Sequence, residues 1–200
     1  MRANVYGNVF LSATPLKGLT LKSSFMPSIA YTRYGFYMGQ LTKINVGKNP
    51  AYVNQYNSFN WAYVWDNTIN YNTQFKSHKF NIMAGYSVNE KFYERYDSGV
   101  KGLTFNSLWH NMGAASELTM VDSDYTRWTV LSYLARINYS FKDRYLLTLT
   151  GRYDGASNLA PGHKWQFFPS AAIAWRISEE EWMKSCLLYT SPSPRDRSLS

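Results

Sequence analysis

The composition of this 200-residue chain is aromatic without being strongly apolar. Aromatic residues make up 18% of the sequence, yet its mean hydropathy is −0.39. No apolar run reaches the roughly eighteen residues of a transmembrane helix, which excludes that kind of membrane span. The formal net charge is +8, but the basic residues are scattered along the chain rather than gathered in one stripe, which argues against a nucleic-acid partner.

The first predicted element is a hairpin near the N-terminus. Apolar and polar side chains alternate over residues 4–13 and again over residues 19–25, as in strands with one apolar face. Pro15 and Gly18 lie between these runs and favour a tight turn. Residues 31–59 are rich in Tyr, Asn and Gly and show no sustained period, so we interpret them as a long loop.

Two further hairpins show the same alternation. Residues 61–75 and 80–88 form the second hairpin around a short turn, and residues 90–125 are predicted to be a second long loop. The third hairpin pairs residues 127–141 with residues 145–154. Short and long connections therefore alternate, which is typical of an up-and-down membrane barrel with short turns at one rim and long loops at the other.

The stretch from Arg144 to Ile177 contains the clearest pair of strands. Each strand is about ten residues long, the length that crosses a bilayer when tilted. Aromatic side chains stand at the strand ends with smaller apolar residues between them, as in the interfacial girdles around a lipid-facing band. These aromatic residues are Tyr145, Tyr153, Trp165 and Trp175.

We predict an all-β fold, a partial transmembrane up-and-down antiparallel β-barrel with about seven strands of a larger barrel. The alternative is a soluble carbohydrate-binding β-sandwich, which should have shorter loops and strands of about five or six residues. After the last strand, Ser178 and Glu181 have the spacing of a capping box. Residues 178–184 are therefore expected to form either one helical turn or a polar turn.

Two segments also resemble a known family. The strings YLLTLTGRYDGASNL and KWQFFPSAAIAWRISEEEWMK are similar to the hallmark region of the SusC/RagA family of TonB-dependent outer-membrane transporters. YLARINYSFKDRYLL resembles the strand and turn that precede this region. Leu159 and Ala160 depart from the family pattern, in which an aromatic or basic residue followed by Gly is commoner. The resemblance covers most of residues 4–184 and is strongest from Leu131 onward.

The resemblance implies a function for a larger parent protein. It implies import of oligosaccharides or peptides across the outer membrane, powered through TonB, with a SusD-type surface lipoprotein over the extracellular face. The plug domain and the TonB-contacting segment of the family are not in this sequence, and no signal peptide opens it. We therefore expect a fragment that supplies barrel wall, lumen lining and surface loops. A passive porin or an adhesin-type outer-membrane barrel is the alternative function.

No catalytic or metal-binding constellation stands out, so we predict no enzyme activity and no cofactor. The three histidines are scattered, without the paired spacing of metal ligands. The run Asp122-Ser123-Asp124 has alternating carboxylates but lacks the Gly and the distal Glu of a calcium loop.

Binding residues are therefore the remaining candidates. By strand parity Arg136, Asn138, Arg152 and Asp154 face the lumen and are candidates for a substrate path, with pairing to one another or to the plug as the alternative role. Aromatic residues of the predicted loops are candidates for stacking on sugar rings, with loop packing or a girdle as the alternative. This second group is Tyr52, Tyr56, Trp61, Tyr93 and Trp109.

Residues 186–200 read as a translated sequencing-library adapter. CLLYTSPSPRD, from Cys186 to Asp196, matches the in-frame translation of such an adapter. We therefore divide the chain into a partial barrel, residues 1–185, and a non-native tail, with a disordered Ser/Pro/Arg tail as the alternative. Cys186 is the only cysteine, so an intrachain disulfide is excluded.

Overall fold

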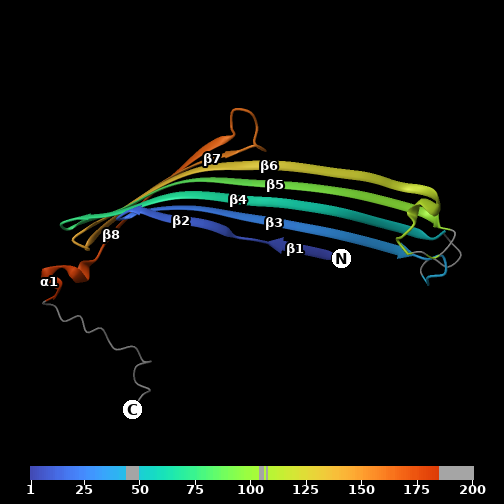
Figure 1. Cartoon of the computed structure of the whole chain (residues 1–200), viewed down its shortest axis with the longest axis horizontal. Helices are drawn as coiled ribbons and strands as arrows, with labels where there is room; N and C mark the ends of the chain where they lie inside the picture. The colour runs from blue at the N-terminus through green and yellow to red at the C-terminus, as the bar shows by residue number, and fades with distance from the viewer. Residues whose placement is uncertain (44–49, 104–105, 107, 185–200) are drawn as a thin grey trace, which may run out of the picture.

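One antiparallel sheet accounts for nearly all of the chain that the structure describes (Figure 1). The computed structural model describes residues 1–43, 50–103, 106 and 108–184, and the predicted tail lies outside them. Neighbouring strands follow the order β1-β3-β4-β5-β6-β7-β8, and β2 also pairs with β3. The strands are β1 (Arg2–Tyr6), β2 (Val9–Leu16), β3 (Leu19–Met38), β4 (Tyr52–Phe75), β5 (His78–Leu103), β6 (Ala115–Phe141), β7 (Tyr145–Ala156) and β8 (Trp165–Trp175).

The first two strands behave as one strand with a gap. Both pair with β3, and their registers are continuous. The gap faces Pro27, which has no N–H to donate across the pair. Gly7 still donates to the Pro27 carbonyl at 3.0 Å. The described strands therefore occupy seven neighbouring positions in the sheet, which confirms the predicted partial barrel wall.

The register gives the sheet two chemically different faces. Residues directly opposite one another in antiparallel strands point to the same side. One such row is apolar and defines the side that we name the outer face: Leu19, Tyr71, Ile82, Ile137, Leu149 and Ala171. The adjacent row on the opposite side, the inner face, is mostly polar: Asn72, Asn81, Asn138, Thr148 and Ala172. The predicted parity of the strands is confirmed.

The outer face is uncovered along the described chain. Figure 1 shows a single layer of strands, and large apolar side chains such as Ile69 remain exposed, in this case by 51%. A soluble sandwich would bury these rows against a second sheet. Its strands would also be short, whereas β3 has 20 residues and β6 has 27. The sandwich alternative is therefore excluded, and the apolar rows match the lipid-facing band of a membrane barrel.

Aromatic rows bound this apolar band at both ends. Near the short turns the rings of Tyr145 and Trp175 stack with centroids 6.2 Å apart. At the other end Trp165 stacks on Tyr153 at 4.8 Å and pairs with Gly155. Along β7 the band spans about ten residues, roughly 25 Å of height at the usual strand tilt, which is the apolar height of an outer-membrane barrel.

The two long loops predicted from the sequence are mostly strand, and that prediction was wrong. Residues 39–51, rather than 31–59, connect β3 to β4. Residues 104–114, rather than 90–125, connect β5 to β6. Strands β3 to β6 continue well past the aromatic row at Tyr153 and Trp165 and form a wall above the membrane. Their period was hidden in the sequence because both faces of such a wall meet water.

The chain leaves the sheet through two helical turns, η2 (Ile177–Glu179) and α1 (Glu181–Lys184). The helical alternative predicted for this stretch is therefore confirmed, but Ser178 lies inside η2 and does not cap it, because the N-cap residue is Arg176 and makes no side-chain capping bond. Glu180 anchors the turn to the rim of the sheet, because its carboxylate accepts hydrogen bonds from Tyr145 Oη at 2.7 Å, Arg144 Nη1 at 3.0 Å and Trp175 Nε1 at 3.1 Å. No helix among the described residues has the length and apolar character needed to span a membrane.

We expect this anchor to weaken in acid. The hydrogen bond from Tyr145, followed by that from the Trp175 indole, holds the pKa of the Glu180 carboxyl below its usual value. Because the pKa is depressed in the folded state, the stabilisation is complete above the pKa of an unfolded Glu, about 4.3, and is lost as the pH falls through the lower folded value. In thermal unfolding, Glu180→Gln should be less stable than the native protein at neutral pH and should converge with it in acid. Parallel pH profiles of the two proteins would contradict this expectation.

Candidate functional site

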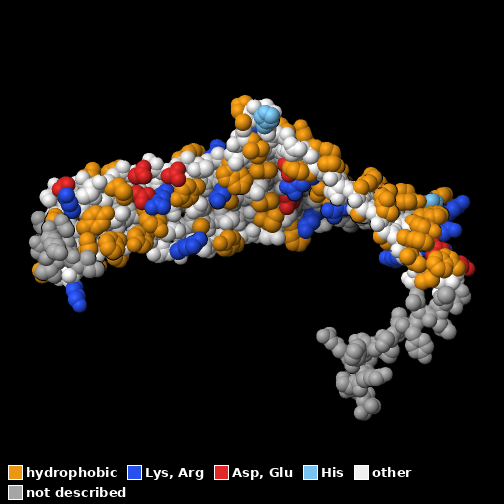
Figure 2. Space-filling view, turned by 180° about the vertical axis from the view of Figure 1, so that it is seen from behind, with side chains coloured by type: hydrophobic (Ala, Val, Ile, Leu, Met, Phe, Trp, Pro, Cys, Tyr) orange, Lys and Arg blue, Asp and Glu red, His pale blue; other side chains and the backbone are white. Residues whose placement is uncertain are grey.

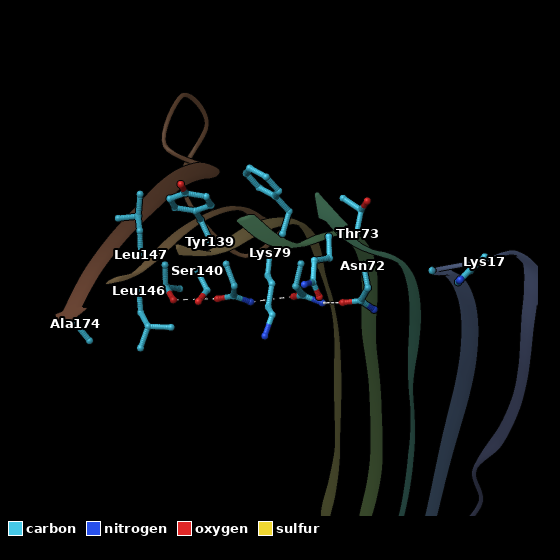
Figure 3. A pocket seen from close by; sticks show the side chains of 15 residues that line it. Lys17, Asn72, Thr73, Lys79, Tyr139, Ser140, Leu146, Leu147 and Ala174 are labelled. Atoms are coloured by element: carbon cyan, nitrogen blue, oxygen red, sulfur yellow. Dashed lines mark hydrogen bonds between the residues drawn. The ribbon is translucent and has the colours of Figure 1, made fainter. Parts of the chain in front are cut away.

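A ladder of polar side chains crosses the inner face near the short turns (Figure 3). Asn81 donates to Asn72 at 2.6 Å, Asn138 donates to Asn81 at 2.9 Å, and Thr148 donates to Asn138 at 2.9 Å. These residues come from four adjacent strands, β4 to β7. The ladder therefore ties the strands together and holds a row of amides in fixed positions on the inner face.

A hollow of about 810 Å³ lies at this end of the sheet. Figure 3 shows Asn72, Lys79 and Ser140 on one side of the strands that line it, and Tyr139 on the opposite side. Lys79 Nζ is held 2.6 Å from a carboxylate oxygen of Asp143 in the β6–β7 turn. The amides of the ladder and Lys79 are therefore already hydrogen-bonded or ion-paired within this lining, as expected of a lumen wall that meets water.

The four predicted lumen residues all lie on the inner face, within the height of the apolar band. Arg152 is paired with Asp154 at 2.7 Å and donates to Ser132 at 3.2 Å, while Asn138 belongs to the ladder. Arg136 is exposed, and no ion pair among the described residues involves it. Figure 2 shows acidic and basic side chains next to each other at several places along one face of the sheet. Arg136 is therefore an exposed cation on the inner face, at the height of the apolar band.

A second group of residues lies higher on the inner face, beyond the apolar band. Tyr34 stacks on Tyr56 with ring centroids 5.0 Å apart. On the other side, the Arg95 guanidinium lies 4.2 Å from the centre of the Tyr56 ring and makes two hydrogen bonds of 2.6 Å to Asp97. We name these four residues the tyrosine–arginine cluster. The bidentate carboxylate fixes the guanidinium over the ring, so the cluster is a rigid aromatic surface with charge at its edge.

Three of the predicted aromatic candidates, Tyr52, Tyr56 and Tyr93, also lie on the inner face. They belong to strands and not to the loops in which we predicted them. Tyr93 borders a hollow of about 300 Å³ together with Lys91 and Trp128. The upper inner face thus places aromatic rings beside cationic groups over several strands.

The other two aromatic candidates lie away from this surface. Trp61 is on the outer face of β4, where its ring centroid is 5.3 Å from that of Tyr63. Trp109 belongs to the β5–β6 connection and occupies the space that a side chain at Gly35 would fill. Trp109 therefore packs against the wall, in agreement with the loop-packing alternative.

Groups that the sequence did not indicate lie in the strands that we had predicted to be loops. Arg95 and Asp97 share one face because they are two residues apart on β5. On the outer face, the carboxylate of Glu90 accepts hydrogen bonds from Tyr63 Oη at 2.8 Å and from Arg127 Nε at 2.6 Å. Arg95 and Asp97 have a sequence signal, their spacing of two residues, once strand β5 is extended through them. The contacts of Glu90 have none, because they depend on how β4, β5 and β6 pair.

Metal ligation finds no support in the described part of the chain, where no three His, Cys, Asp or Glu residues cluster in a way that could hold an ion. His78 Nδ1 instead lies 2.7 Å from Tyr139 Oη. Asp122 and Asp124 lie on strand β6 and not in a loop that could wrap a calcium ion.

Comparison with known proteins supports the same architecture. The chain is similar to TonB-dependent receptor P26 of Formosa agariphila, with 31% identity over 191 residues that make up 92% of this chain and 19% of the relative. It is also similar to TonB-dependent receptor SusC of Bacteroides thetaiotaomicron, with 48% identity over 59 residues, 30% of this chain and 6% of that protein. The solved structure of the RagAB peptide transporter matches 92% of this chain and 21% of its own chain, with a TM-score of 0.82 at 19% identity. The chain is part of the barrel of a SusC/RagA-type TonB-dependent receptor.

Two of the curated relatives match most of this SusC/RagA-type segment. The segment spans only about a fifth of their length. No protein-family model matches the chain. Receptors of this type are outer-membrane proteins, which confirms the predicted location and the family resemblance. The apolar band of the outer face therefore meets lipid, and the inner face lines the lumen of the receptor.

Proposed function

We propose that the receptor containing this segment imports an oligosaccharide or a peptide across the outer membrane. Energy would be delivered through TonB, and a SusD-type lipoprotein would sit at the extracellular mouth. The observation that supports this most is the inner face, where polar and aromatic side chains are held in place near the short turns, at mid-height and on the upper wall. The solved structural neighbour is described as a peptide transporter, and the curated relatives are described as TonB-dependent receptors.

The chemistry of the inner face suits a polar oligomer. The upper wall presents the tyrosine–arginine cluster, the middle presents the exposed cation of Arg136, and the lower wall presents the amide ladder. Aromatic rings stack on sugars and on peptide side chains, and amides bind hydroxyl groups and peptide bonds equally well. These features therefore support a sugar oligomer and a peptide alike.

Uptake measurements with the intact receptor test this proposal against the passive-barrel alternative. Cells that produce the receptor should accumulate a labelled oligosaccharide or a labelled oligopeptide from a mixed pool, and deletion of TonB should abolish the accumulation. Accumulation that continues without TonB would support a passive pore. A receptor that accumulates neither class, although it is folded in the membrane, would contradict the proposal.

Tyr56→Ala should weaken substrate capture by about two- to tenfold, because a stacking contact is worth roughly 0.5–1.5 kcal/mol. Tyr96→Ala is the matched control, since Tyr96 is on the outer face of the same wall and is 55% exposed. Affinity of the intact receptor for the transported oligomer, measured by calorimetry, is the readout. Equal losses in the two variants would remove Tyr56 from the binding surface.

A further inference from the structure

The upper part of β6 is an open strand edge. β7 ends at Ala156, which pairs with Val130 of β6, whereas β6 itself extends back to Ala115. Figure 1 shows β6 running on past the β7–β8 turn to the far end of the wall. Among the described residues no strand pairs with β6 over residues 115–128 on this side. We name this stretch the β6 edge.

The backbone of the β6 edge points hydrogen-bonding groups into the open side. Thr129 shows which residues of β6 face the β7 side. Its N–H donates to Ser157 Oγ at 2.8 Å, and its carbonyl accepts from the Ser157 N–H at 2.9 Å, just beyond the end of β7. In an antiparallel strand every second residue points its N–H and carbonyl the same way. The groups of Arg127, Tyr125 and Ser123 therefore face the open side. The Ser123 N–H is bonded to Asp122 Oδ1 at 2.9 Å, and the stretch contains no proline to block pairing.

The side chains along this edge form two different rows. On the outer side Val121 is 73% exposed and Tyr125 is 61% exposed. On the inner side Asp122 and Asp124 are both exposed. An added strand would therefore meet apolar groups on one face and carboxylates on the other.

The inner row has a charge imbalance that an added strand could relieve. Asp122 lies directly opposite Asp97 on β5, and like charges in directly opposed positions are destabilising. Asp97 is already paired with Arg95, at 2.6 Å. A cationic side chain on the open side would be the direct neighbour of Asp122 and would complete the alternation of charges across the sheet.

We infer that the β6 edge binds an extended segment of a partner protein at the cell surface by strand addition. The segment would carry Lys or Arg residues facing the inner side in alternation with apolar residues facing the outer side. Strand addition satisfies the backbone groups that face the open side, with the Ser123 N–H exchanging its bond to Asp122 for one to the added strand, and the side-chain alternation sets the register. A lipid or a saccharide would leave the row of backbone groups unpaired, so a polypeptide is the occupant that fits. This inference does not depend on the transported substrate.

The test is binding of a fluorescent ten-residue peptide of alternating Lys and Val to the intact receptor in detergent, followed by anisotropy. We expect saturable binding, and a peptide of the same composition with its Lys and Val residues in separate blocks should bind at least about tenfold more weakly. Replacing both Asp122 and Asp124 with Lys should cause a similar loss, with D122N/D124N intermediate. Heat-modified electrophoretic mobility confirms that each variant is folded.

Methylation of the peptide backbone separates strand addition from charge attraction. In antiparallel pairing, the direction of every pair in this sheet, the valine N–H groups of the peptide would point toward β6 and the lysine N–H groups away from it. N-methylation at the valines should therefore lower affinity by about tenfold, while N-methylation at the lysines should leave it unchanged. Equal effects of the two methylated peptides would overturn the inference. So would a folded receptor that does not bind the alternating peptide, since its edge would then be closed by the receptor itself or unsuited to a strand.

Discussion

Replacing Ile69 with Arg is expected to destabilise the folded barrel by about 2–4 kcal/mol, the cost of a basic side chain at mid-height on the lipid face. Ile69 lies between Leu21 and Ala84 in the middle of the apolar band, and it is 51% exposed in the described sheet. Its exposed surface therefore meets hydrocarbon in the membrane. The measurement is urea unfolding of the intact receptor reconstituted in lipid vesicles.

The neighbouring substitution Asn70→Arg is the matched control. Asn70 is one residue along β4 and points to the inner face, between Thr20 and Met83. An arginine there meets the wet lumen, so unfolding should change by less than about 1 kcal/mol. If both variants lost the same stability, the assignment of the two faces would fail, and with it the location of the lumen surfaces described above.

The positions of the strands in the band could be predicted because lipid on one side and water on the other impose a period of two. Rows such as Ile82, Ile137 and Leu149 follow directly from that alternation. The pairing order also followed from the sequence, since short turns join consecutive strands of an up-and-down barrel. The strand positions and the number of wall positions were therefore correct.

Above the band the same reasoning fails for a physical reason. Phe59 and Tyr125 on the outer face, and Tyr56 and Tyr93 on the inner face, show that aromatic residues occupy both sides of the upper wall. With water on both faces no alternation is required, and the stretch has the composition of a loop. Cross-strand hydrogen bonds and ring contacts maintain the strands there, and these depend on pairings that a single sequence does not reveal.

The residues of the candidate site could be predicted within the band but not above it. Parity placed Arg136 and Asn138 on the inner face because they lie in the band. The partners of Tyr56 could not be found, because Tyr34 and Arg95 lie in stretches that the composition of the sequence assigned to loops. Trp61 begins the predicted strand 61–75, and the parity of that strand places it on the outer face with Tyr63, not among the binding aromatics of the loops.

Gly18→Ala is expected to destabilise the receptor by roughly 3 kcal/mol or more, through two separable causes. Gly18 has φ of +83°, in the left-handed region, and a Cβ there would lie 2.1 Å from the backbone oxygen of Asn72. Asn72 donates its N–H to the Gly18 carbonyl at 2.7 Å, so relieving the clash would separate the β2–β3 turn from β4.

Gly162→Ala isolates the first cause, because Gly162 has φ of +84° with no atom within 4 Å of its added Cβ. Strain in the left-handed region alone should cost about 1–2 kcal/mol. The excess loss in Gly18→Ala therefore measures the contact with β4. Equal unfolding free energies for the two variants in vesicles would mean that the turn moves away from β4 at no cost. The strand register behind the amide ladder would then be fixed elsewhere, for example between Asn81 and Asn138.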